Sequence, residues 1–241
     1  MRSVITRIMA REHTAKNATS MITVASMKNI DTQDLPRSLQ AKARGETRMA
    51  LIWCGTELLT ERGFQITGIE EILSRVGVPK GSFYHYFKSK QDFGIAVIDN
   101  YVDFYDEKMS RIFDDETCSP LSRIQRFVDE GKEGMTRYEF KRGCLIGNMG
   151  QELASLNDEF RMRLEAVLIA WEARLKRCLD LAIAHKELPA NTDTTALSNF
   201  FWIGWEGAIL RAKLTCSTAP LDQFSTMFFS LALNQNSLSK T

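Results

Sequence analysis

Apolar residues recur along most of the chain at the three- and four-residue spacing of amphipathic helices, and no segment alternates as a β-strand does. Cap signals divide the pattern: helix starts are marked by Ser119-Pro120, by Asn157 and by either Thr192 or Asp193, and Gly63 marks a helix end. We therefore predict an all-α fold. The expected helices span 47–62, 67–76, 79–87, 89–113, 120–140, 144–154, 157–184, 193–214 and 220–233.

Residues 67–90 differ from the rest because they read as two short helices joined by a tight turn. Thr67 is a suitable N-cap for the first helix, and Gly77 permits the positive φ at which that helix ends. Pro79 suits the first turn of the second helix, and Ser89 is placed to cap the next one. The pattern predicts a helix-turn-helix within a three-helix module.

The second of these helices and the residues after it as far as Lys90 carry no acidic side chain. Lysines and hydroxyls can donate to phosphate oxygens, serine can also reach a base edge, and glycine lets a backbone approach DNA closely. The alternative is an aromatic-rich helix in a solvent-exposed hairpin. The candidate DNA-binding residues are Thr67, Lys80, Gly81, Ser82, Tyr84, His85, Tyr86 and Lys90.

Composition narrows the function classes. The 241 residues suffice for one or two domains, and a net charge of +1 means that any basic surface must be local. Five irregularly spaced cysteines without a CxxC pair argue against a disulfide framework and a zinc site, and favour a reducing cytoplasm. With three histidines and no HExxH or Walker motif, we expect no cofactor, no metal and no enzyme activity.

The predicted domain order begins with a basic extension, residues 1–44, that lacks an apolar period and is expected to be disordered. It is either an arm that lies along DNA or an extension without a role of its own, since translation could also start at Met9, Met21 or Met27. It does not have the pattern of a secretory signal. Residues 45–92 are predicted to bind DNA. Residues 93–236 are predicted to bind an effector and dimerise, and 237–241 form a tail. The apolar stretch 196–210 is too short for a membrane span and contains Asn199 and Glu206, so a protein interface is expected there.

The stretch GVPKGSFYHYFKSKQDF, residues 77–93, closely resembles the signature of TetR-family transcriptional regulators. FKRGCLIGNMGQEL (140–153) and FWIGWEGAILRAKL (201–214) resemble the branch of acrylate-responsive (AcuR-type) and electrophile-responsive (NemR-type) repressors. The resemblance implies a one-component repressor that binds a palindromic double-stranded operator as a homodimer. A small effector would release it.

The resemblance also implies that the last two long helices pack against their equivalents in a second subunit. Two recognition helices about 34 Å apart would then meet successive major grooves. Packing within the chain's own core is the alternative reading. The candidate dimerisation residues are Gly204, Gly207 and Ala208, whose small size would let backbones approach, together with Phe224 and Phe228.

Aromatic residues of the central helices are candidate walls of an apolar effector pocket, although they could equally form core. The pocket candidates are Trp171, Phe201, Trp202 and Trp205, with Asn148, Arg211 or Lys213 to orient a carboxylate or carbonyl. The resemblance makes acrylate, or a related small unsaturated acid or electrophile, the leading effector.

Cys144 follows Lys141 and Arg142 and lies near a helix start, so its thiol pKa is expected to be lowered; an inert buried thiol is the alternative. Relatives that respond to electrophiles carry a matching cysteine in GCL and a lysine in AKL, which points to Cys144 and Lys213. Two mechanisms remain open: reversible binding, which we favour, and covalent addition to the thiol.

The adjacent acids Glu70-Glu71 and Asp114-Asp115-Glu116 are expected on solvated surfaces and not in a catalytic site. The runner-up function is a non-DNA-binding helical enzyme or small-molecule carrier. Salt-dependent binding to a DNA fragment would separate the two classes.

Overall fold

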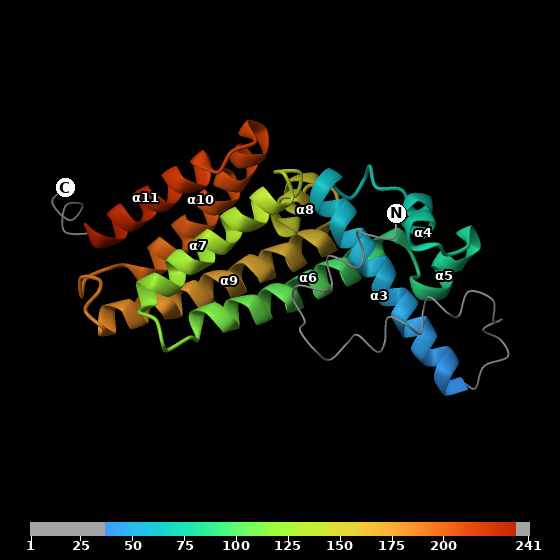
Figure 1. The fold of residues 1–241 in the computed structure, drawn as a ribbon, viewed down its shortest axis with the longest axis horizontal. Coiled ribbons are helices and arrows are strands. Elements are labelled where there is room, and N and C mark those ends of the chain that lie inside the picture. The colour runs from blue at the N-terminus through green and yellow to red at the C-terminus, as the bar shows by residue number, and fades with distance from the viewer. Residues whose placement is uncertain (1–36, 235–241) are drawn as a thin grey trace. The chain divides into compact units, whose positions relative to one another are not determined.

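The computed structural model describes residues 37–234, with side chains from residue 43 onward, and every regular element within that range is helical (Figure 1). The predicted all-α fold is confirmed. The elements are α3 (Arg37–Arg62), α4 (Ile69–Val76), the 3-10 turn η2 (Lys80–Ser82), α5 (Phe83–Tyr86), α6 (Lys90–Phe113), α7 (Pro120–Arg137), α8 (Leu145–Leu153), α9 (Asp158–Ala184), α10 (Thr194–Thr215) and α11 (Ala219–Leu233).

The chain divides into two compact units, residues 1–47 and 48–241. Of the first unit the structure describes only the beginning of α3, where Thr47 Oγ1 donates to the Ala43 carbonyl oxygen at 3.0 Å. The helix begins ten residues before the predicted start at Thr47, so the disorder predicted for residues 37–44 is also wrong. Strong helix formers in that stretch continue the helix although they form no apolar stripe. The rest of the predicted extension, 1–36, and the tail, 237–241, lie outside the described residues.

The turn between α4 and η2 forms as predicted. Gly77 has φ +78°, and its N–H bonds to the Leu73 and Ser74 carbonyl oxygens, as expected of a left-handed C-cap. Thr67, in contrast, does not cap α4, because Gly68 holds that position without a side-chain bond. The Thr67 hydroxyl instead donates to the Gly63 carbonyl oxygen at 2.7 Å, so it closes the loop after α3.

Three phenylalanines hold the helix-turn-helix on the long helix that follows it. The ring centroids of Phe83, Phe87 and Phe93 lie 5.0 to 5.8 Å apart, and all three side chains are buried. A Cβ on Gly55 would overlap the Phe93 ring, so α3 and α6 approach closely at that point. α5 is therefore fixed to α6 by packing, and no flexible linker separates them.

The remaining helices form a bundle in which α10 packs between α9 and α11, and α7 packs on α6, α9 and α11 (Figure 1). The predicted caps at Ser89, Ser119 and Asn157 are confirmed, and of the two candidates Thr192 and Asp193 it is Asp193 that caps α10; each of these side chains accepts a bond from the N–H three residues on. None of the described helices has the length and apolarity needed to cross a membrane.

Candidate nucleic-acid interface and effector site

One turn of η2 and α5 presents the predicted DNA-binding side chains at the surface. Lys80, Gly81 and His85 are exposed, and the Tyr84 side chain is 71% accessible. Ser82 and Tyr86 are half-buried. These residues, named here the recognition turn, place an ammonium, hydroxyls and a bare backbone on one short element, which is the chemistry that phosphates and base edges accept.

Lys80 is held by only one described partner, an ion pair of 2.9 Å with Glu70 on α4. Both side chains are about three-quarters exposed, so water screens the pair and its contribution to stability is small. The ammonium can therefore exchange Glu70 for another anion at little cost.

Two other predicted contacts serve the loop before α4. The Lys90 ammonium donates to the Gln65 carbonyl oxygen at 3.1 Å and lies 4.8 Å from the centre of the Phe64 ring. Partial burial lowers the pKa of Lys90, and the Glu152 carboxylate opposes that shift. The Thr67 side chain is fully buried, so in this structure its hydroxyl is not presented to DNA and instead positions α4.

The end of α3 exchanges a helical hydrogen bond for bonds to the bundle. The Thr60 carbonyl oxygen lacks the usual partner four residues on, because the chain leaves the helix at Gly63. It accepts instead from Gly143 N at 3.1 Å, from Asn148 Nδ2 at 2.9 Å and, at 3.5 Å, from Lys213 Nζ. Three separate segments therefore converge on one backbone oxygen.

The Phe64 N–H, which would have bonded Thr60 in a continuing helix, bonds a side chain of α8 instead. Phe64 N and Gln65 N each donate to one carboxylate oxygen of Glu152 at 2.6 Å. The Arg142 guanidinium pairs with Glu57 and Glu61 of α3 and lies 4.0 Å from the centre of the Tyr138 ring. We call this set the α3 joint: Glu57, Thr60, Glu61, Phe64 and Gln65 on one side, with Arg142, Gly143, Asn148, Glu152 and Lys213 on the other.

Cys144 caps the start of α8 and is buried. Burial raises the pKa of its thiol well above the ordinary value, and the nearby Glu206 charge raises it further. The predicted lowering of the thiol pKa is wrong, because the cations expected to cause it face elsewhere. Arg142 faces α3, and the Lys141 ammonium pairs with Glu139.

Lys213 and Cys144 do not form the predicted pair in this structure. The Lys213 ammonium bonds the Thr60 carbonyl, and its pKa is lowered by burial, with Glu61 opposing. Asn148 belongs to the same joint, since its amide also donates to Thr60. Two of the residues expected to orient an effector therefore hold the end of α3.

Glu206 is the acid that faces Cys144, and it is not among the residues predicted from the sequence to bind the effector. Burial raises its pKa from 4.5 to about 7, while a hydrogen bond with the Cys144 thiol opposes that shift. Its Oε1 atom has no partner among the described residues, and a Cβ on Gly147 would overlap Oε2. The signal was available, because this is the sole acid within the apolar stretch 196–210.

The aromatic residues predicted to wall a pocket are buried against one another. Phe201 and Trp205 stack with centroids 5.8 Å apart and belong to the core between α7, α10 and α11. Trp171 and Trp202 lie 4.9 Å apart, and the indole N–H of each lacks a partner among the described residues. The core interpretation holds for the first pair, whereas each indole of the second pair has a polar group without a described partner, and Trp202 lies one turn before Glu206 on α10.

The outer surface of α10 and α11 is apolar and grooved. The groove is lined by Gly204, Gly207, Ala208, Arg211, Pro220, Gln223, Phe224 and Met227. Exposed apolar side chains flank it: Phe200, Ile203, Leu210 and Leu214. We call these twelve residues the α10–α11 face.

Two predicted roles change at this face. Arg211 is exposed in the groove and is not placed beside Cys144, so its expected effector contact is not supported. Phe228 is fully buried against Phe201, with centroids 5.0 Å apart, so in this structure it is not available to a second subunit. The resemblance that made Phe228 a candidate indicates which helices meet a second subunit, but not which face of the helix is turned outward.

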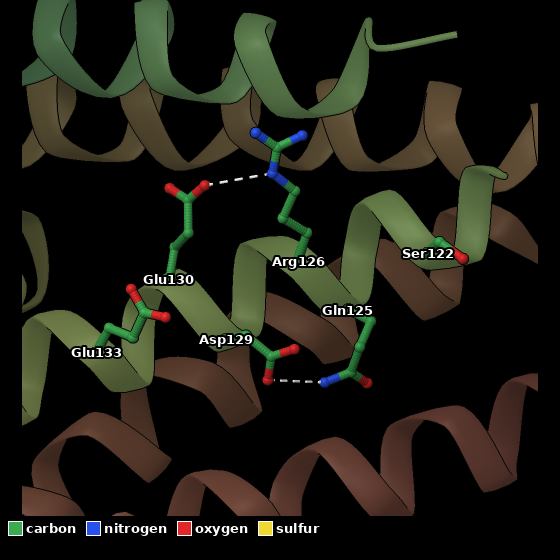
Figure 2. Close-up of a pocket in the computed structure, with 6 residues that line it drawn as sticks. All are labelled: Ser122, Gln125, Arg126, Asp129, Glu130 and Glu133. Carbon is green, nitrogen blue, oxygen red and sulfur yellow. Dashed lines mark hydrogen bonds and ion pairs between the residues drawn. The ribbon is translucent and has the colours of Figure 1, made fainter. Parts of the chain in front are cut away.

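A polar hollow on α7 is the other surface depression of note (Figure 2). Its side chains come from one helix and pair with one another: Arg126 Nε lies 3.4 Å from Glu130 Oε1, and Gln125 Nε2 donates to Asp129 Oδ1 at 3.0 Å. It contains none of the residues that the sequence singled out, and most of its charged groups already pair within the protein.

Known proteins match both parts of this arrangement. A family model for bacterial regulatory proteins of the tetR family matches residues 54–97, and one for tetracyclin repressor-like C-terminal domains matches 120–228. The transcriptional regulator AcuR of Cereibacter sphaeroides is 45% identical over 205 residues, covering 81% of this chain and 94% of AcuR. The repressor NemR of Escherichia coli is 27% identical over 177 residues, covering 73% of this chain and 89% of NemR.

A solved structure agrees with these sequence matches. The crystal structure of regulatory protein TetR from Rhodobacter sphaeroides has a TM-score of 0.73 with 46% sequence identity. The alignment covers 76% of this chain and 96% of that one. The similarity therefore extends over the helix-turn-helix and the bundle together.

Proposed function

Because this chain belongs to the TetR family of bacterial transcriptional regulators, we propose that it is a homodimeric repressor that leaves a palindromic operator when a small effector binds. Residues 45–92 form the DNA-binding domain, and residues 93–236 bind the effector and the second subunit. The recognition turn meets the major groove, with Lys80 the best candidate for a base contact.

The α3 joint is the observation that carries this proposal. Operator binding needs a fixed spacing of two recognition turns, and a ligand changes that spacing only if it binds one arrangement better than the other. The joint ties the end of α3 to α8 and α10, and both helices also border Cys144 and Glu206. A ligand that moves α8 or α10 thus alters the DNA-binding domain through direct hydrogen bonds.

The α10–α11 face supplies the dimer contact. Its exposed apolar side chains would leave water on association, and Gly207 leaves open space for a partner backbone. This surface includes Gly204, Ala208 and Phe224 from the predicted set, while Ile203 and Met227 replace Phe228 as its prominent apolar contacts.

The effector is acrylate or a related small unsaturated acid or electrophile. The resemblance to AcuR-type and NemR-type repressors supports that class. Within it we favour reversible binding, because the raised thiol pKa of Cys144 leaves little thiolate to add to an alkene. A repressor that binds its effector reversibly can also reset.

Fluorescence anisotropy with DNA from upstream of the protein's own gene tests the proposal. We expect tight binding that weakens steeply as salt rises, and release on adding acrylate. Indifference to that fragment and to fragments upstream of neighbouring genes would support the alternative, a helical enzyme or carrier that does not bind DNA.

Intact-mass measurement separates the two sensing mechanisms. After exposure to acrylate, wild type and Cys144→Ser should both release DNA, and neither should gain mass. Added mass on wild type, together with loss of release in Cys144→Ser, would instead establish the covalent route.

A further inference from the structure

Three buried polar atoms without described partners belong to neighbouring side chains of α9 and α10. Trp202 Nε1 and Glu206 Oε1 lie four residues apart and so share one face of the helix, and the Trp171 ring packs on Trp202. No described residue bonds any of the three. Since buried polar groups in native proteins are nearly always paired, three in one place indicate a binding partner that this cluster is built to accept.

The cluster joins four helices. The Glu206 carboxylate packs against the backbone of α8 at Gly147, and the Tyr105 ring of α6 lies 5.5 Å from that of Trp171 on α9. These groups are tightly packed here, so an occupant must displace α8 or α10. Both helices carry residues of the α3 joint, which gives such an occupant a direct effect on α3.

The charge balance of the cluster constrains its ligand. Burial brings the pKa of Glu206 to about 7, and its one described hydrogen-bond partner is the Cys144 thiol. The Lys213 ammonium bonds the Thr60 carbonyl oxygen. The Lys108 ammonium pairs with Glu130 at 3.5 Å and also lies 5.7 Å from the centre of the Tyr105 ring, at the edge of the cluster. The other ionisable groups that face the cluster are Tyr101 and Tyr105 of α6, and burial raises the pKa of both hydroxyls above its ordinary value, so both are neutral near pH 7.

The protonated form of Glu206 would turn the cluster into a set of donors. Its carboxyl O–H and the indole N–H groups of Trp171 and Trp202 would then face the ligand, and each can donate to a carbonyl or carboxylate oxygen. The ionised form would place a negative charge among them, and no described cation pairs with that carboxylate. A carboxylate ligand would be repelled in that state.

On the basis of the regulator described above, we propose that Trp171, Trp202 and Glu206 form the polar wall of the effector site, and that a small carboxylate binds there together with one proton. The proton comes from solvent and resides on Glu206. A neutral amide of the same shape binds without it. Glu206 is thus the residue that sets which charge state of ligand the site accepts.

Calorimetric titration of the full chain with acrylate and with acrylamide tests this linkage. In two buffers of different ionisation enthalpy at pH 8, acrylate should take up close to one proton and acrylamide none. Acrylate affinity should fall about tenfold per pH unit above pH 7, because the proton must be restored to Glu206 before binding. Acrylamide affinity should stay constant over the same range.

Glu206→Gln keeps the size of the side chain and removes the titration. It should bind acrylate with no proton uptake and no pH dependence. Glu172→Gln is the matched control, because burial also raises the pKa of Glu172 but that residue lies outside the cluster, and its profile should follow wild type.

Acrylate binding by wild type without proton uptake at pH 8 overturns the proposal, whatever the variants do. So does an unchanged pH profile in folded Glu206→Gln, or the absence of binding by both ligands. Operator binding measured on the same samples separates the two levels. If wild type still binds its operator, this inference alone has failed; if it binds no operator, the proposed function has failed.

Discussion

The recognition turn and the buried pair of Cys144 and Glu206 both present polar side chains, yet the surroundings of those side chains differ. On the recognition turn, Lys80 and Tyr84 extend into solvent, and the described partner of Lys80 is the equally exposed Glu70. In the pair, Cys144 and Glu206 are buried together, and each shifts the titration of the other. The first site is set by a short stretch of chain, and the second by residues 62 positions apart, numbered 144 and 206.

This difference explains how a surface motif can act alone while a buried site depends on its neighbours. Exposed side chains keep the chemistry that their residue type gives them in water. Buried ones lose it, since desolvation and one close charge can move a pKa by several units. The two cations that precede the thiol in sequence, Lys141 and Arg142, pair with acids instead, and burial and Glu206 dominate the shift of the thiol pKa.

The largest effect is expected from a change outside both sites. Gly207→Glu places a charged side chain where a Cβ meets nothing within 4 Å in one subunit, so folding of the single chain should be preserved. The dimer should dissociate, and operator affinity should fall by about 100-fold or more as one half-site contact is lost. Analytical ultracentrifugation and anisotropy measure the two outcomes.

Gly134→Glu on α7 is the matched control, because its Cβ also meets nothing within 4 Å and it lies off the α10–α11 face. It should remain dimeric and bind DNA as wild type does. A Gly207→Glu protein that is still dimeric at micromolar concentration would mean that the subunits associate through another surface.

The pH dependence of stability should expose the buried site next. The folded pKa of Glu206 is about 7 and the ordinary value is 4.5, so between these values the unfolded chain loses a proton that the folded chain keeps. Stability from this group is complete below about pH 4.5, falls as pH rises toward 7 and then levels off, a loss of up to about 3 kcal/mol. Glu206→Gln should lack this slope in urea titrations; an identical slope in both proteins would place the titrating group elsewhere.

Lys80→Ala should weaken operator binding by about 1 to 3 kcal/mol and relax the choice of base at one position. Glu70→Gln is a useful counterpart, since it frees the Lys80 ammonium and removes an acid near the DNA. That variant should bind slightly more tightly than wild type. Unchanged affinity and base preference in Lys80→Ala would remove this residue from the interface.

Lys90→Ala should have a smaller and less specific effect. Loss of its charge should reduce affinity across all sequences and lower the slope of log K against log salt by about one. Because Lys90 also holds the Gln65 carbonyl, thermal unfolding should show a slight destabilisation. Destabilisation with an unchanged salt slope would assign Lys90 to the loop alone.

The smallest response should come from Cys144. Brief treatment of the folded protein with iodoacetamide should modify the exposed Cys216 and leave Cys144 unmodified, as read by peptide mass mapping. Unfolding in urea should make both accessible. Faster labelling at Cys144 than at Cys216 would mean that the thiolate is readily formed in solution.

Sequence patterns were sufficient for the elements whose causes are local. The caps at Ser89 and Asn157 and the left-handed Gly77 follow from residues within a few positions. The predicted cap at Thr67 is wrong because its hydroxyl donates to the Gly63 carbonyl oxygen before it in the chain, and does not bond to the start of α4. The α3 joint could not be predicted, since its acceptor is a main-chain oxygen and its donors come from residues 143, 148 and 213.

Because the α3 joint is centred on a main-chain oxygen, that of Thr60, its hydrogen bonds should survive a change of side chain at residue 60. The three donors bond a carbonyl group, which every residue possesses. The Thr60 hydroxyl takes no part, because it donates to the Thr56 and Glu57 carbonyl oxygens of its own helix. Alanine scanning at this position would therefore report a routine buried threonine. Substitutions at residue 60 during evolution could therefore leave the response to an effector intact. Replacing the peptide bond after residue 60 by an ester, or replacing Asn148 and Lys213 together, would weaken the joint itself. Such a protein should stay folded and bind DNA but no longer respond to the effector.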